Sequence, residues 1–121
     1  MFSMAIDFDG TLVEDKFPEI GEPKRDVIEL VRRLQEAGVR TILWTCRNGD
    51  MLPPAVEWCK QQGLNFAAVN ENLPEIQEKW KGDTRKVLAD YYLDDKSVSY
   101  GLPIFRLQEL VIQAEKEKRG E

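Results

Sequence analysis

Hydrophobic residues along the chain fall into short continuous runs that alternate with longer stretches of helical spacing. The short runs, which are typical of buried strands, lie at 4–6, 39–45, 66–69, 90–93 and 103–105. The stretches that predict helices lie at 23–38, 50–63, 84–89 and 107–114, with one or two further turns around 73–80. Strands that alternate with helices are joined by right-handed crossovers into a mainly parallel sheet with helices on both faces. We therefore predict an α/β fold in three layers around a mainly parallel five-stranded sheet.

Proline, glycine and aspartate residues mark the predicted ends of two of these helices. Pro23 suits the first turn of a helix, and Gly38 follows the last apolar position of the same helix. In the next helix, Asp50 is a candidate N-cap and Gly63 a stop. The stretch 12–22 has no helical period, so it is expected to be a short flap or an irregular loop.

Length and composition predict one globular domain over residues 1–121. Hydrophobic residues make up 42% of the chain and charged residues 32%, and no repeat or linker divides it. The net charge of −5 argues against binding to nucleic acid or to an anionic membrane surface. No stretch resembles a signal peptide or is apolar over a length that would span a bilayer, and Cys46 and Cys59 suit a reducing compartment. These features predict a cytoplasmic protein.

The chain contains no histidine, and this absence excludes several kinds of chemistry. Serine and cysteine hydrolases that use a histidine base are excluded, as are zinc sites that need imidazole ligands. Any reaction must therefore be carried by carboxylates, lysine, arginine, hydroxyl groups and a hard metal ion.

Two carboxylates follow the first predicted strand directly. Residues 4–6 lead into Asp7 and Asp9, and residues two apart on a strand point to the same side. Two carboxylates on one side repel each other unless a cation or a shared proton relieves them. Gly10, which comes next, allows the backbone to turn sharply or to approach a ligand closely. The pair of aspartates therefore indicates a divalent-metal site.

Other polar side chains follow later strands. Thr45 ends the run at 39–45, and Asp94 and Asp95 follow the run at 90–93. Ligands of an open α/β sheet bind outside the carboxyl ends of its strands, so these side chains are predicted to meet in one crevice. Lys86 stands shortly before the later run, and its side chain is long enough to reach that crevice. Each residue alone is weak evidence, but their order and placement together are specific.

This order of residues resembles the motifs of the haloacid dehalogenase-like (HAD) superfamily of phosphohydrolases. The similar positions are Asp7-Phe8-Asp9-Gly10-Thr11 for the first motif, Thr45 for the second, Lys86 for the third and Asp94-Asp95 for the fourth. The resemblance covers essentially the whole chain and marks the phosphatase branch, because dehalogenases lack the second aspartate. It implies a Rossmann-like fold. The stretches between the motifs are too short for an inserted cap domain, so we expect a capless member.

The resemblance implies distinct roles for the acidic residues. Asp7 attacks phosphorus and forms an aspartyl-phosphate, and Asp9 protonates the leaving oxygen and then deprotonates the attacking water. Asp7, Asp94 and the backbone carbonyl of Asp9 hold Mg²⁺, which lets the anionic nucleophile approach the anionic phosphate. Asp95 either binds the metal directly or orients its waters, and the sequence leaves both options open.

The resemblance also implies which groups bind the phosphate. The hydroxyl of Thr45 and backbone N–H groups around Cys46 and Gly10 hold the non-bridging oxygens. Lys86 neutralises charge on the phosphoryl group and on Asp7.

Two further basic residues are weaker candidates for substrate contacts. Arg47 lies just past the second motif, where it either contacts substrate or is an exposed loop arginine. Lys16 lies in the stretch 12–22, which follows the first motif and is the main candidate for selectivity.

The expected function is Mg²⁺-dependent hydrolysis of a small phosphorylated metabolite, such as a sugar phosphate or a nucleotide. Two alternatives are a phosphotransferase or phosphomutase, which passes the phosphoryl group to another acceptor, and a catalytically idle phosphate-binding module. Capless members of the superfamily act on large substrates or have the site closed by a neighbouring subunit. For this chain we therefore leave open the alternative of a homo-oligomer in which a neighbouring subunit closes the site.

Overall fold

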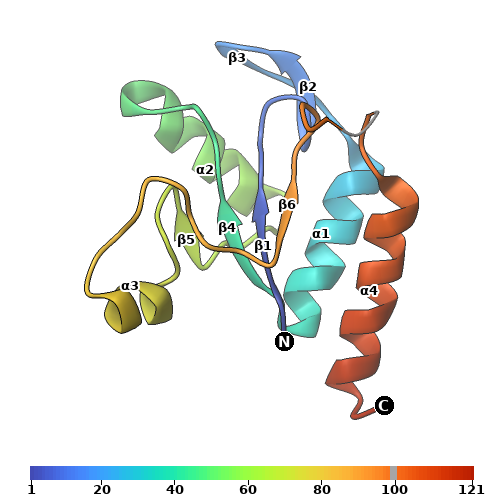
Figure 1. Cartoon of the computed structure of the whole chain (residues 1–121). Coiled ribbons are helices and arrows are strands. Elements are labelled where there is room, and N and C mark those ends of the chain that lie inside the picture. Colours follow the sequence, from blue (N-terminus) through green and yellow to red (C-terminus); the bar gives the residue numbers. More distant parts are fainter. Residues whose placement is uncertain (99–100) are drawn as a thin grey trace.

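The computed structural model describes residues 1–98 and 101–121, and within them a four-stranded parallel sheet has the order β5-β4-β1-β6. The strands of this sheet are β1 (Ser3–Ile6), β4 (Arg40–Leu43), β5 (Ala68–Val69) and β6 (Tyr91–Leu93). In its register, Ile6 lies between Leu43 of β4 and Leu93 of β6. The predicted α/β class with a mainly parallel sheet is confirmed (Figure 1).

Helices cover both faces of this sheet (Figure 1). In the described residues they are α1 (Arg25–Ala37), the short 3₁₀ helix η1 (Gly49–Met51), α2 (Leu52–Gln61), α3 (Pro74–Trp80) and α4 (Ile104–Lys118). Met4 and Ile6 pack in a core with α1, α2 and α4, whereas Ala5 packs in a smaller core against Ile76 of α3. This division follows from the alternation of side chains along a strand. None of the helices in the described part of the chain has the length and apolar content of a membrane-spanning segment.

The helix α1 forms where apolar residues recur with helical spacing. Its buried positions are Val27, Ile28, Leu30, Val31, Leu34 and Ala37. Gly38 follows in the left-handed conformation with φ 101°, as the glycine at the predicted helix end requires. The predicted start at Pro23 is wrong, because Pro23 pairs with Val13 in a hairpin and the helix begins only at Arg25.

Residues 13–23 form an antiparallel hairpin, and the sequence predicted a flap or an irregular loop there. Its strands are β2 (Val13–Lys16) and β3 (Glu19–Pro23). Apart from buried Val13, the hairpin residues are exposed or half-buried, so the sequence carries no alternating apolar pattern that would have revealed the strands. In Figure 1 the hairpin lies beyond the carboxyl ends of β1 and β6, at the top of the view. The chain therefore places its own flap beside the candidate crevice.

The predicted fifth strand at 103–105 is wrong. Ile104 begins α4, and the N–H of Leu107 donates to the carbonyl of Pro103 over 2.9 Å in the first turn. The apolar pair at 104–105 suggested a strand, but Phe105 is 85% exposed while Ile104 packs against the core. Ile104 and Leu107, which are one helical turn apart, both pack in the core, so this segment is the start of a helix.

The predicted helix at 84–89 is also wrong, since these residues run as bends and irregular chain. The buried side chain of Asn72 holds the segment instead. Its Nδ2 donates to Asp83 Oδ1, and its Oδ1 accepts from the N–H of Leu88, each over 2.7 Å. These bonds use backbone and side-chain groups that a helix would need for itself. The predicted N-cap at Asp50 is also wrong, because Asp50 lies inside η1, before α2 begins.

Candidate metal centre

Three carboxylates meet at the carboxyl ends of β1 and β6. Asp7 follows β1 directly, and its N–H donates to the carbonyl of Leu93, the last residue of β6, over 3.0 Å. This register brings Asp7 beside Asp94 and Asp95, and one oxygen of each lies within 4.8 Å of the others. All three side chains are half-buried. The meeting of these residues, which we predicted from the strand ends, is therefore observed, and we refer to them as the acidic triad.

The surroundings of Asp7 make its negative charge costly without a cation. Burial and the nearby charge of Asp94 raise the pKa of Asp7 from the ordinary 3.8 to about 7, although a hydrogen bond from Thr11 opposes the shift. A positive charge between the carboxylates would favour their ionised forms. Carboxylate oxygens on a half-exposed rim, where water completes the coordination, are the ligands that Mg²⁺ prefers. The acidic triad therefore fits a hard divalent cation.

Gly10 and Thr11 bring the first strand close to Asp95. Gly10 has φ +90°, and a Cβ atom there would lie 2.2 Å from Asp95 Oδ2. The buried hydroxyl of Thr11 accepts from the N–H of Asp95 over 3.1 Å and lies 3.1 Å from Asp7 Oδ2. The N–H of Gly10 donates to the carbonyl of Val13 over 2.8 Å, so the expected phosphate contact of this N–H is not available in this conformation.

The carboxylate of Asp9 lies against Arg47 rather than in the acidic triad. Arg47 Nε and Nη2 donate to Asp9 Oδ2 and Oδ1, each over 2.8 Å. Arg47 is 2% exposed, so the alternative of an exposed loop arginine is wrong. A metal contact through the backbone carbonyl of Asp9 stays a prediction.

Thr45 lies two residues beyond β4 and is held by Asn70. The N–H of Thr45 donates to Asn70 Oδ1 over 2.8 Å, and Asn70 Nδ2 donates to the carbonyl of Arg47 over 3.1 Å. The Thr45 hydroxyl oxygen accepts from the N–H of Arg47 over 3.1 Å. Sequence reasoning missed Asn70, although it follows the run at 66–69 as Thr45 follows its own strand. Asn70 therefore shapes the loop that is expected to bind phosphate.

Six of the ten candidate residues line an open cavity of about 360 Å³. Its lining comprises Asp7, Asp9, Asp15, Phe17, Thr45, Cys46, Arg47, Asp94 and Lys96. Asp15 and Phe17 belong to the β2–β3 hairpin and its turn, so the flap forms one wall. Lys96 had no predicted role, and its Nζ lies 3.6 Å from Asp15 Oδ2 and 3.8 Å from Asp95 Oδ2.

Two predicted lysines lie apart from this cavity in the described structure. Lys86 is exposed, and its Nζ lies 5.4 Å from the centroid of the Tyr92 ring. Lys16 is exposed on β2 between two residues that line the cavity. The structure brings neither side chain to the acidic triad, and the role of Lys86 stays a prediction.

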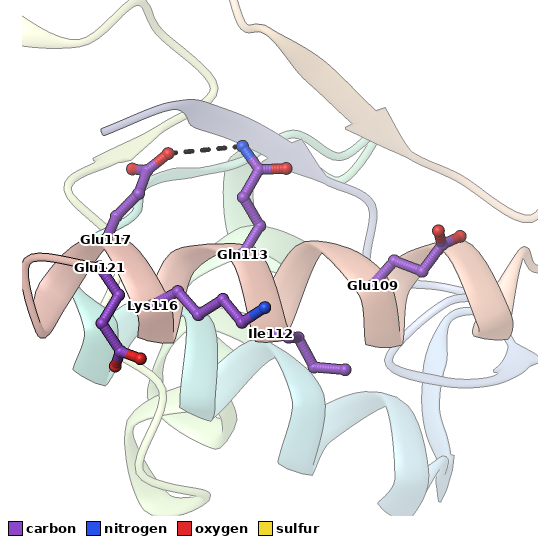
Figure 2. A pocket seen from close by; sticks show the side chains of 6 residues that line it. All are labelled: Glu109, Ile112, Gln113, Lys116, Glu117 and Glu121. Atoms are coloured by element: carbon purple, nitrogen blue, oxygen red, sulfur yellow. Dashed lines mark hydrogen bonds between the residues drawn. The ribbon is translucent and has the colours of Figure 1, made fainter.

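A larger hollow of about 490 Å³ lies on the outer face of α4 and the residues after it (Figure 2). Its lining comprises Glu109, Ile112, Gln113, Lys116, Glu117 and Glu121. Gln113 Nε2 donates to Glu117 Oε1 over 3.4 Å, as the dashed line in Figure 2 marks. All of these side chains come from one helix and its end, remote from the strand ends. At the acidic triad, by contrast, polar side chains from distant segments of the chain come together, so we take that place as the candidate site.

A comparison with solved structures shows the family of this α/β chain. The chain is 38% identical to a conserved protein from Bacteroides thetaiotaomicron whose structure is known. The match covers 99% of this chain and 92% of that chain, with a TM-score of 0.76. At this identity and coverage, the chain belongs to the same family as the Bacteroides thetaiotaomicron protein. No protein-family model matches the chain, and no curated protein matches it.

We expect the contribution of Asp7 to the stability of the metal-free protein to fall as the pH rises from about 4 to about 7, the range over which the pKa of Asp7 is raised. Across this range the folded protein keeps a proton on Asp7 that the unfolded chain has released, so the free energy of unfolding falls. Bound Mg²⁺ should remove this loss and stabilise the protein most above about pH 7. Urea unfolding at several pH values, with chelator or with Mg²⁺, measures both effects.

The variant Asp7→Asn is the control for this measurement, because it cannot titrate. The difference in unfolding free energy between the two proteins isolates Asp7 from the other carboxylates. A difference that does not change with pH in the metal-free proteins would contradict the raised pKa of Asp7.

Proposed function

We propose that the protein is a Mg²⁺-dependent phosphomonoester hydrolase of the HAD superfamily, with a Rossmann-like core and no cap domain. The observation that carries the proposal is the acidic triad of Asp7, Asp94 and Asp95, with Asp9 and Thr45 lining the same cavity. Residues of three distant segments, in the order of the HAD motifs, border one cavity of about 360 Å³. Such a convergence is much more specific than any one of the motifs.

Asp7 is the proposed nucleophile. One of its carboxylate oxygens forms a bond to phosphorus as the bond from phosphorus to the leaving oxygen breaks, which leaves an aspartyl-phosphate. Asp9 gives a proton to the leaving oxygen. A water then attacks the phosphorus of the aspartyl-phosphate, and Asp9 takes its proton. The bond from phosphorus to the Asp7 oxygen breaks, so inorganic phosphate leaves and the Asp7 carboxylate is restored.

Asp7, Asp94 and Asp95 would hold the cation. When bound, it neutralises charge so that the Asp7 carboxylate and the phosphate, both anionic, can come together. Thr45 and the backbone at Cys46 border the cavity and are the proposed contacts of the non-bridging oxygens. Lys96 borders it too and adds a positive charge where the sequence had suggested Lys86.

The size of the cavity and the hairpin that walls it support the proposal of a small substrate. The hairpin residues Asp15 and Phe17 wall the cavity on one side. Phe17 is 56% exposed, and its ring offers an apolar surface for the part of the substrate beyond the phosphate. A sugar phosphate or a nucleotide has both features, an anionic phosphate and a ring that can lie against an aromatic side chain.

The test is turnover of p-nitrophenyl phosphate with Mg²⁺ and with chelator. We expect phosphate release that depends on Mg²⁺. Absence of any Mg²⁺-dependent release in the wild-type protein would overturn the proposal. A panel of sugar phosphates and nucleotides, with and without an added acceptor alcohol, then identifies the substrate class and separates hydrolysis from phosphoryl transfer.

A further inference from the structure

Arg47 is a buried cation whose guanidinium makes five hydrogen bonds to described residues. It is 2% exposed. Two bonds go to Asp9 over 2.8 Å each, and three go to the backbone carbonyls of Pro18 (3.2 Å), Glu19 (3.1 Å) and Met51 (3.4 Å). A guanidinium has five N–H groups, so its donor capacity is matched by these acceptors. Arg47 is therefore directed at protein groups and has no donor left for a substrate in this conformation.

Two aromatic rings fix the plane of this guanidinium. Arg47 Cζ lies 5.2 Å from the centroid of the Phe8 ring and 5.1 Å from that of the Phe17 ring. Phe8 is buried and stands between the two aspartates of the first motif in the sequence, whereas Phe17 belongs to the turn of the hairpin. Cation–π contacts of this kind add to the hydrogen bonds and resist rotation of the group. A lysine offers neither the planar fork nor the stacking.

The contacts of Arg47 join three parts of the molecule, of which the first motif and the hairpin border the cavity. Asp9 belongs to the first motif, Pro18 and Glu19 belong to the hairpin, and Met51 ends η1. A displacement of the hairpin would break the bonds to its carbonyls and remove the Phe17 ring from the guanidinium. The position of the Asp9 carboxylate is therefore coupled to the position of the hairpin through one side chain.

The ion pair leaves part of the Asp9 carboxylate open to the cavity. A carboxylate offers about four lone-pair positions, and the fork of Arg47 occupies one on each oxygen. The Asp9 side chain is 16% exposed and borders the cavity, so a remaining position can face a substrate. The bidentate contact orients the carboxylate without using all of it.

We infer that Arg47 is a positioning residue for proton transfer at Asp9, and that the hairpin helps to hold Arg47 through two carbonyls and the Phe17 ring. This inference rests on the proposed function, because it concerns the step in which Asp9 protonates the leaving oxygen. That step matters most for a poor leaving group, such as the alkoxide of an alkyl phosphate. It matters little for p-nitrophenolate, which leaves without a proton.

The test compares turnover of p-nitrophenyl phosphate and glycerol phosphate by wild type, Arg47→Lys and Arg47→Gln. We expect Arg47→Lys to lower kcat/KM for glycerol phosphate by about 10²-fold or more, and for p-nitrophenyl phosphate by less than about 10-fold. The ratio kcat/KM is the quantity compared because it reports formation of the aspartyl-phosphate, whereas kcat also contains its hydrolysis, in which Asp9 acts on both substrates alike. Arg40→Lys is the matched control, because Arg40 makes a similar two-bond pair with Glu75 (2.9 and 2.8 Å) at the far end of β4. It should change neither rate.

The Asp9→Asn background shows whether Arg47 acts through Asp9. There, Arg47→Lys should produce no further discrimination between the two substrates. Equal losses of kcat/KM on both substrates in the wild-type background would show a purely structural role and overturn the inference. Absence of turnover by the wild-type protein would instead overturn the proposed function, so the two failures are distinguishable. Arg47→Lys keeps the buried positive charge and serves if Arg47→Gln does not fold.

Discussion

Replacing Asp7 by asparagine is expected to abolish phosphate release while making the metal-free protein more stable. Asparagine has almost the same shape but cannot attack phosphorus as an anion, so kcat should fall by at least about 10³-fold. The charge that it removes is one that burial and Asp94 disfavour, as the raised pKa of Asp7 shows. Activity and stability therefore move in opposite directions at this position.

The two effects of Asp7→Asn are measured separately. Thermal unfolding in chelator at about pH 8 should show a Tm higher by about 3–6 °C, which corresponds to roughly 1 kcal/mol for a chain of this size. The rise in Tm on adding Mg²⁺ should shrink, because one carboxylate ligand is lost. Asp50→Asn is the control, since Asp50 is exposed in η1 and does not line the cavity.

Some outcomes would count against this account of Asp7. If Asp7→Asn lowered the Tm of the metal-free protein, the carboxylate would be stabilised rather than strained in the acidic triad. If the variant kept its turnover, Asp7 would not be the nucleophile, whatever its place in the metal centre.

Replacing Gly10 by alanine is expected to damage both the fold and the metal centre. The new Cβ would lie 2.2 Å from Asp95 Oδ2 and 2.6 Å from Asp95 Cγ, so the carboxylate must move. The backbone at Gly10 also has φ +90°, which a residue with a Cβ adopts at a cost. We expect a loss of about 2–4 kcal/mol in the free energy of unfolding. Mg²⁺ should bind at least about 10-fold more weakly.

Gly63→Ala is the matched control for this prediction. Gly63 also has a positive φ, +82°, but its added Cβ would meet only Arg32 Cδ at an ordinary 3.6 Å. It should cost about 1 kcal/mol and leave Mg²⁺ binding unchanged. Urea unfolding in chelator and titration with Mg²⁺ measure the two quantities. Equal losses in both variants would show that the contact with Asp95 does not matter.

The regular parts of the chain were predictable because a helix or strand with one buried face has apolar residues at regular intervals in the sequence. The strands at 4–6 and 39–45 and the helix that ends at Gly38 all carry such a pattern, and the structure confirms them, the second strand over the shorter range 40–43. The hairpin at 13–23 is largely exposed, and the segment at 84–89 is held by one buried side chain, Asn72. Neither segment therefore has a regular spacing of apolar residues in the sequence from which its structure could be predicted.

The acidic triad was predictable for a geometric reason. Parallel strands end at the same edge of a sheet, so residues just after β1 and β6 must lie close together, however far apart they are in the chain. Asp7 and Asp94 follow that rule directly. Their order in the sequence therefore sufficed to place them.

The partner of Asp9, by contrast, was decided only by the tertiary structure. The side chain of a loop arginine can point in many directions, and no local pattern indicates that Arg47 is buried. Its orientation follows from the hairpin carbonyls, the rings of Phe8 and Phe17 and the Asp9 carboxylate, which come together only when the chain has folded. The sequence determined where the acidic groups meet, because strand ends impose it, and the packing of the hairpin determined how Asp9 is held.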